Sequence, residues 1–205
     1  MTPLSEIWAV TKPLKIPAVL EHLLRDRFKG RTAVTASLRA RSVVALQLVA
    51  EIDPTTPVIF CHAGPLYPES EQYRNELIDR LGLTDVRTPL ADEADCVEGD
   101  LDHVEWVMAS SGLGRVRQAI HLNHSLGDFD AWISAAYHDP TVLGGRHRVD
   151  VEGRLYRINP LLRWSKEQVR RFMRARELPY HAFVGRDAET PPPPENAEKI
   201  PSYHF

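Results

Sequence analysis

Short apolar runs alternate with amphipathic segments along most of the chain. Apolar runs of strand length occupy residues 31–37, 57–62, 84–90 and 130–136. Helices are expected over 16–28, 41–53, 69–82, 112–124 and 165–178. A β-hairpin is expected over 146–161, with its turn at Glu152-Gly153. Strands that alternate with helices predict an α/β fold, an open and mostly parallel sheet with helices on both faces.

Several local signals refine this plan. Ser165 and Gln168 form a capping pattern at the start of one helix, and Gly82 follows the end of another. The acidic stretch 91–104 is expected to be an exposed loop. Residues 1–184 are predicted to form a single domain. The segment 185–205, which contains four consecutive prolines, is predicted to be an extended or disordered tail.

Composition limits the classes of function. The chain has 205 residues, 43% of them hydrophobic and 26% charged, which is typical of a soluble globular protein. No apolar run approaches the roughly 18 residues of a membrane span, and the first ten residues do not resemble a signal peptide. A formal net charge of −3 argues against general nucleic-acid binding. The expectation is a cytoplasmic protein that binds neither membranes nor nucleic acids.

Cysteine and arginine usage points to a site for anions and not for metals. Cys61 and Cys96 are too few for a four-cysteine metal site, so we expect two free thiols, with Cys61 buried by packing. Of the 25 basic residues, 20 are arginine, whose planar guanidinium fits phosphate or sulfate better than lysine does. In an open parallel sheet, ligands bind beyond the carboxyl ends of the strands. The loops 37–42, 61–67 and 134–146 are therefore expected to converge.

Four blocks of this sequence carry a resemblance to a known family. They are "AVTASLRARSVVALQLVAEIDPTTPVIF", "AGPLYPESEQYRNEL", "FDAWIS" and "INPLLRWSKEQVRRFMRARELPYH". Their order and spacing resemble the phosphoadenosine phosphosulfate reductase family over roughly residues 30 to 184. The resemblance implies a Rossmann-like, adenine nucleotide α-hydrolase-like fold. It also implies an adenosine phosphosulfate ligand held on the first strand–helix loop, and a tail cysteine that attacks sulfur before thioredoxin or glutaredoxin releases sulfite.

The chain departs from that family where the chemistry is carried out. No cysteine follows Cys96, and the tail reads "EKIPSYHF" where the family has a Glu-Cys-Gly-Leu-His-like motif. Without a thiol there is no route to an S-sulfocysteine intermediate. Ser110 and Ser111 stand where the adenylyl-sulfate branch has adjacent cysteines, so no iron–sulfur cluster is expected.

The resemblance also nominates a nucleotide and phosphate site. In the first loop, Arg39 takes the family's glycine position and Arg41 its Gln or Asp position. Each arginine is either an anion clamp at a helix N-terminus or a solvent-facing residue of the first turn. His62 replaces an aspartate, Arg115 stands at the position of a substrate-contacting lysine, and Arg146 is a remnant of an arginine. The complete set is Ser37, Leu38, Arg39, Ala40, Arg41, Ser42, His62, Ala63, Gly64, Arg115 and Arg146.

These observations lead to one leading hypothesis and two alternatives. The leading hypothesis is a phosphoadenosine phosphosulfate reductase-like protein that binds an adenosine phosphate or phosphosulfate but lacks thiol-dependent reduction. The first alternative is a non-catalytic partner or regulatory subunit of a catalytic homologue, with the proline-rich tail as a docking segment. The second is an enzyme with different chemistry on an adenylated substrate, with His62 and the arginines acting at phosphate. A homodimer or a heteromer with a catalytic homologue is possible; co-purification with such a homologue would favour the first alternative, and a clean homodimer would count against it.

Overall fold

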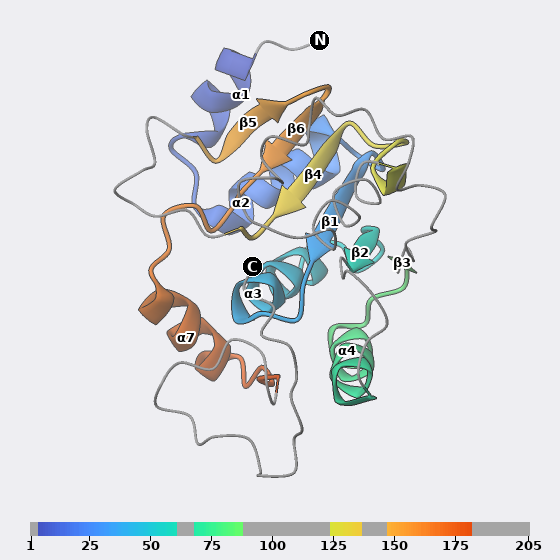
Figure 1. Ribbon diagram of the computed structural model, residues 1–205. Helices are drawn as coiled ribbons and strands as arrows, with labels where there is room; N and C mark the ends of the chain where they lie inside the picture. Colours follow the sequence, from blue (N-terminus) through green and yellow to red (C-terminus); the bar gives the residue numbers. More distant parts are fainter. Residues whose placement is uncertain (1–3, 61–67, 88–123, 137–146, 182–205) are drawn as a thin grey trace, which may run out of the picture.

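A computed structural model describes residues 4–60, 68–87, 124–136 and 147–181 (Figure 1). The described strands form one six-stranded sheet in the order β3-β2-β1-β4-β6-β5. All neighbouring strands in it are parallel except β5, which pairs antiparallel with β6. The strands are β1 (Thr32–Ala36), β2 (Val58–Phe60), β3 (Val86–Arg87), β4 (Ala131–Ser134), β5 (Val149–Glu152) and β6 (Leu155–Ile158).

The helices fall close to their expected positions, with one addition. The described helices are α1 (Leu4–Thr11), α2 (Ile16–Glu21), η1 (His22–Arg27), α3 (Ala40–Ala50), α4 (Pro68–Leu81) and α7 (Lys166–Ala175). The single helix expected over 16–28 begins as α2 and continues as the π-helix η1, where Phe28 N–H donates to the Leu23 carbonyl over 2.9 Å. The short helix α1 was not expected from the sequence.

The capping signal at α7 is confirmed in full. Gln168 N–H donates to Ser165 Oγ over 3.2 Å, and Ser165 N–H donates to Gln168 Oε1 over 2.8 Å. These two bonds satisfy N–H groups that have no helical carbonyl to bond. They fix the start of α7 directly after the connection that leaves β6.

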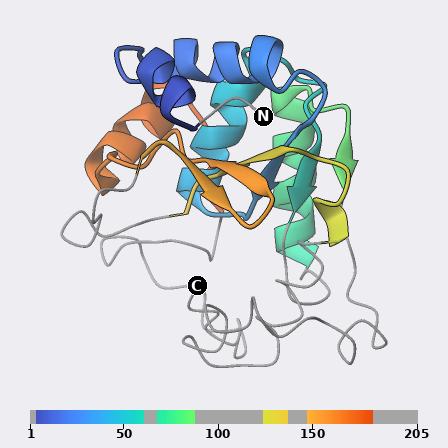
Figure 2. The same ribbon diagram turned by 90° about the horizontal axis from the view of Figure 1, so that it is seen from above.

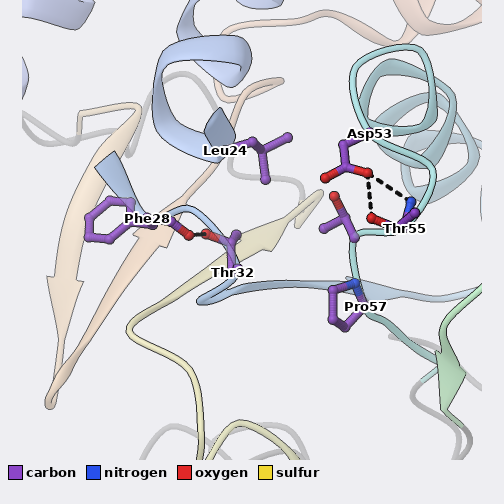
Figure 3. Close-up of a pocket in the computed structure, with 8 residues that line it drawn as sticks. Leu24, Phe28, Thr32, Asp53, Thr55 and Pro57 are labelled. Carbon is purple, nitrogen blue, oxygen red and sulfur yellow. Dashed lines mark hydrogen bonds between the residues drawn. The ribbon is translucent and has the colours of Figure 1, made fainter. Parts of the chain in front are cut away.

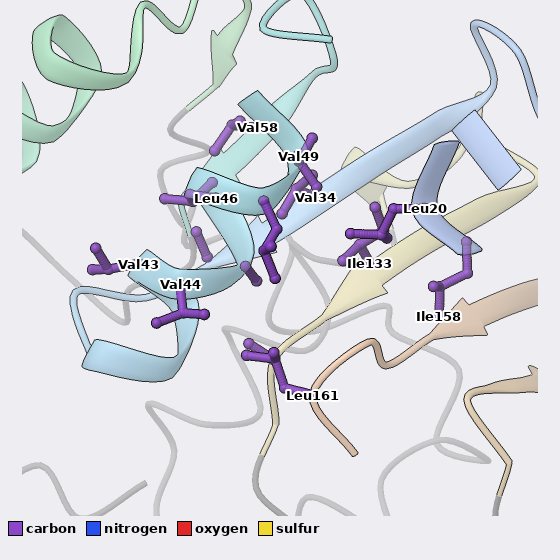
Figure 4. Close-up of a cluster of buried hydrophobic side chains, with 14 of the residues drawn as sticks. Leu20, Val34, Val43, Val44, Leu46, Val49, Val58, Ile133, Ile158 and Leu161 are labelled. Atoms are coloured by element: carbon purple, nitrogen blue, oxygen red, sulfur yellow. The ribbon is translucent and has the colours of Figure 1, made fainter. Parts of the chain in front are cut away.

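The main core lies between one face of the sheet and the described helices. Because side chains alternate along a strand, Val34, Val58, Ile133 and Ile158 all point to this face, where residues of α2, η1, α3, α4 and α7 pack on them. Figure 4 shows part of this cluster, and Figure 2 shows the described helices on the same side of the sheet. Burial of this apolar layer holds α3 firmly against β1 and β4.

The opposite face of the sheet carries a smaller cluster. Ala33 and Ile59 are fully buried there and pack with Leu126, Phe129 and Leu155. Residues 124 and 125 are helical, at the end of the helix expected over 112–124, and the rest of that helix lies outside the described residues. The predicted acidic loop 91–104 and the tail 185–205 lie outside them as well. The prediction of an α/β fold with an open, mostly parallel sheet is confirmed. Helices were predicted on both faces; the named helices cover one face, and beside Leu126 on the other face only the helical residues 124 and 125 are described.

Within the described ranges, no helix combines the length and the apolar character needed to cross a membrane.

Candidate functional site

The carboxyl ends of the central strands meet at one edge of the sheet. Thr35 of β1 lies beside Ser134 of β4, and β1 also pairs with β2. The chain therefore continues from β1 to β2 on one side of β1 and returns to β4 on its other side. This arrangement is the topological switch point at which open α/β sheets bind ligands. The loop 37–39 and the residues 135–136 leave the sheet here, whereas 61–67 and 137–146 lie outside the described residues.

The loop after β1 leads directly into the N-terminus of α3. Arg39 is the N-cap residue, with extended backbone (φ −88°, ψ 151°) and no side-chain capping bond. The first helical bond is donated by Val43 N–H to the Arg39 carbonyl over 3.1 Å. The N–H groups of the first turn have no helical carbonyl to bond, and the helix dipole is positive at this end. The local geometry suits an anion.

The remaining side chains of the loop are occupied by packing and by each other. Leu38 and Ala40 are partly buried and pack against the main core, so their side chains serve the fold, and only their backbone groups are suited to a ligand. The hydroxyls of Ser37 and Ser42 lie 3.0 Å apart and are hydrogen-bonded. This contact closes the loop across the helix start. The loop has two charged, half-buried side chains, Arg39 and Arg41.

Arg41 differs from both sequence-based interpretations. Its guanidinium donates to three backbone carbonyls: Nε to Ala135 (3.1 Å), Nη1 to Trp164 (2.9 Å) and Nη2 to Leu161 (2.6 Å). The interpretation as a solvent-facing residue is wrong, because the side chain is half-buried among these carbonyls. The interpretation as an anion clamp is also revised, because the three guanidinium nitrogens already donate to backbone carbonyls and not to an anion.

Asn159 links residues 135–136, which follow β4, to the turn between β6 and α7. It was missed from the sequence as a site residue. It follows β6 directly and is 2% exposed. Its Nδ2 donates to the Ala136 carbonyl over 3.0 Å, and its backbone N–H donates to the Arg148 carbonyl over 2.7 Å. Its Oδ1 is buried, and no hydrogen-bond partner for it lies in the described part of the chain. Its position at a strand end, in the block "INPLLRWS", is the signal from which it could have been identified.

Two distant sequence blocks meet at the N-terminal half of α4. His181 Nε2 and Ser70 Oγ are 2.9 Å apart, and both residues are buried. Tyr73 donates its hydroxyl to the Pro179 carbonyl over 2.7 Å, and its ring meets the His181 ring edge-on at a centroid distance of 5.0 Å. The block "GPLYPESEQYR" therefore holds the block "LPYH" in place.

Alkaline pH is expected to weaken the fold through Tyr73. Burial, together with the negative charge of Glu76, raises the pKa of the Tyr73 hydroxyl above its usual value. The contribution of Tyr73 is fully present below the pKa of an unfolded tyrosine, about 10, and is lost as the pH rises further, by at most about 1.4 kcal/mol per pH unit. Urea unfolding between pH 9 and 11 should show a smaller loss for Tyr73→Phe than for the wild type. Equal losses would contradict this role of Tyr73.

The other predicted site residues cannot be placed. His62, Ala63, Gly64, Arg115 and Arg146 all lie outside the described residues, and so do Cys61 and Cys96. Their assignment to the site stays a prediction. In the part of the chain that the structure describes, no cluster of three or more His, Cys, Asp or Glu side chains is arranged to hold a metal ion.

A small pocket lies at the opposite edge of the sheet, as Figure 3 shows. Its lining includes Thr32 at the start of β1 and Pro57 just before β2, with Leu24 and Phe28 of the preceding segment. Asp53 accepts hydrogen bonds from both the backbone N–H and the hydroxyl of Thr55, so its carboxylate is used locally. With a volume of about 60 Å³, this pocket is too small for a nucleotide and lies at the amino ends of the strands.

Known proteins resemble this chain in sequence and in fold. It is 29% identical over 182 residues to "Adenosine 5'-phosphosulfate reductase" of Mesorhizobium japonicum, covering 88% of this chain and 70% of that protein. It is 29% identical over 160 residues to "Phosphoadenosine 5'-phosphosulfate reductase" of Synechocystis, covering 73% of this chain and 63% of that protein. The chain therefore spans about two thirds of the length of these relatives.

A solved structure and a family model agree with this likeness. The crystal structure of phosphoadenylyl-sulfate reductase from Candida auris, a phosphate complex, matches with a TM-score of 0.63 and 16% identity, covering 88% of this chain and 90% of that one. This match confirms the predicted adenine nucleotide α-hydrolase-like fold. The family model described as "Phosphoadenosine phosphosulfate reductase domain" matches residues 31–190, which is most of the chain. The protein is thus a member of the phosphoadenosine phosphosulfate reductase domain family.

Proposed function

We propose that this protein binds an adenosine phosphate or phosphosulfate, in the cytoplasm, through the loop 37–42 and without thiol-dependent reduction. The observation that carries the proposal is the N-terminus of α3, which opens at the switch point of the sheet directly after β1. Helix N-termini in this position bind phosphate through backbone N–H groups and the helix dipole. Family membership supports an adenosine-based anion as the ligand.

The cysteine content supports the second half of the proposal. The chain has two cysteines, so the four thiolates of an iron–sulfur cluster are not available from it. The stretch 198–205, which stands where the family has its tail motif, reads "EKIPSYHF" and contains no thiol. A nucleophile would have to be Cys61, which follows an apolar strand, or Cys96, which lies in an acidic stretch that disfavours a thiolate.

Ligand-induced stabilisation tests the binding. The melting temperature should rise with phosphoadenosine phosphosulfate, adenylyl sulfate or adenosine 3′,5′-bisphosphate, because a ligand at 100 times its Kd adds about 2.7 kcal/mol to the free energy of unfolding. Sodium chloride at the same ionic strength is the control for general salt effects. If none of these nucleotides raises the melting temperature above the control, the binding proposal is wrong.

Sulfite release tests the absence of reduction. With phosphoadenosine phosphosulfate or adenylyl sulfate, thioredoxin and a reductant, the protein should release no more sulfite than a reaction without it. A cysteine-bearing homologue in the same assay serves as the positive control. Turnover above background that disappears in Cys61→Ser or Cys96→Ser would overturn the proposal and identify the thiol that replaces the family's tail cysteine.

A further inference from the structure

We propose that Arg41 is a positioning residue for the nucleotide site, a latch that fixes the loop 37–42 relative to the strand ends. This inference rests on the proposed function and deepens it. Arg41 lies in the first turn of α3, among the N–H groups proposed to bind the anion, yet its guanidinium reaches residues 94 to 123 positions away in sequence. Arg41 thereby links the loop that would hold the phosphate to the residues after β4 and to the turn between β6 and α7.

The geometry of the three bonds makes this connection stiff. Each of the three guanidinium nitrogens donates to a different carbonyl: one just after β4 and two in the turn between β6 and α7. Asn159 ties the same two connections together through the Ala136 carbonyl. The start of α3, residues 135–136 and residues 159–164 are therefore cross-linked by planar, charge-assisted hydrogen bonds. A shift of any one of them would strain bonds to the other two.

The latch also explains how the loop 37–42 keeps its position although Arg39 stands where the family has a glycine. A glycine lets the backbone approach a phosphate closely, and Arg39 at that position removes this freedom. The loop must then be held in its binding position by something else. Its fixed points include the packing of Leu38 and Ala40 on the core, the hydroxyl pair of Ser37 and Ser42, and the guanidinium of Arg41. Since the guanidinium bonds carbonyls, Arg41 acts on the ligand through the loop and not by contact.

Arg154 offers a matched control. Its guanidinium also donates to three carbonyls, those of Phe129 (2.9 Å), Leu126 (2.7 Å) and Gly127 (2.7 Å). These carbonyls lie before β4, at the amino ends of the strands and away from the switch point. Replacement by lysine keeps the charge at either position but loses the planar fork that reaches three acceptors. Both variants lose bonds of the same kind, and only one of them affects the proposed site.

The experiment compares Arg41→Lys with Arg154→Lys by calorimetry, well below both melting temperatures, with adenosine and with adenosine 3′,5′-bisphosphate. Arg41→Lys should raise the dissociation constant of the bisphosphate about tenfold, because the loop proposed to hold its phosphate is misplaced, and that of adenosine by less than about threefold. Arg154→Lys should change them by less than about twofold, as expected for a site without contact to the ligand. If Arg41→Lys does not fold, Arg41→Gln, the residue type of the family's loop, takes its place.

Hydrogen exchange on the unliganded protein tests the latch without any ligand. Arg41→Lys should speed exchange in peptides that cover residues 40–43, 135–136 and 159–164, and Arg154→Lys should speed it at 126–129. Unchanged exchange in Arg41→Lys overturns the latch. Unchanged affinity for the bisphosphate would make Arg41 purely structural, and a loss of affinity with unchanged exchange would make it a direct ligand; both overturn the positioning role. If the wild type binds no nucleotide, the proposed function fails and the positioning role with it, whereas the exchange result stands.

Discussion

His181→Ala is expected to lower the free energy of unfolding by about 2–4 kcal/mol, measured by urea denaturation at neutral pH. His181 is 2% exposed and packs edge-on against the Tyr73 ring. Its removal leaves a cavity and deprives the buried Ser70 hydroxyl of its partner at 2.9 Å. Tyr180→Ala is the control, because Tyr180 is the adjacent residue and is 49% exposed, so its loss should change stability by less than about 0.5 kcal/mol.

A double-mutant cycle separates the hydrogen bond from the lost packing. Ser70→Ala and His181→Ala should be non-additive, with a coupling of about 0.5–3 kcal/mol, because the two side chains contact each other directly. Additive effects within about 0.3 kcal/mol would show that the contact contributes no energy of its own. The cycle therefore tests whether the two sequence blocks are energetically joined as well as adjacent.

The fold could be predicted because its signals are local. The apolar runs of β1 and β4, the Ser165–Gln168 capping box and the Glu152-Gly153 turn each act within a few residues. The exceptions have physical reasons. The helix α1 spans only eight residues, too short for a clear periodic pattern, and it is held by packing that includes a bond from Trp8 Nε1 to the Val149 carbonyl. The π-helix η1 keeps helical spacing of its buried residues, so periodicity did not reveal it.

The site was less predictable because its contacts join residues far apart in sequence. The loop 37–42 was correctly placed at a strand end, but its position does not show where a long side chain is directed. Arg41 was predicted to face an anion or solvent, and it bonds carbonyls more than 90 residues away. The contact of Ser70 with His181 spans 111 residues, and a single sequence without relatives carries no signal for such a pair. The location of the site at one edge of the sheet could be predicted, but the contacts of each side chain there could not.

Arg39→Glu is expected to weaken binding of adenosine 3′,5′-bisphosphate by at least about 30-fold, measured by calorimetry. Arg39 is the half-buried N-cap residue of α3, beside the N–H groups proposed to hold the phosphate. Its replacement changes the local charge by two units, and each unit contributes about 1–4 kcal/mol at about 4 Å, depending on the local dielectric. Affinity for adenosine, which carries no phosphate, should change by less than about threefold on the same reasoning.

The helix dipole favours the new side chain itself. A carboxylate near the N-terminus of α3 gains about 0.3–1 kcal/mol from it, so a loss of affinity in Arg39→Glu would not follow from a less favourable helix dipole. Arg39→Gln, which removes the charge without reversing it, should give an intermediate loss of bisphosphate affinity. A variant that loses affinity for adenosine and bisphosphate equally would contradict a charge contact at Arg39. Hydrogen exchange distinguishes the two arginines, because Arg41→Lys should speed exchange at residues 135–136 and 159–164, whereas Arg39→Glu should lower bisphosphate affinity without this change.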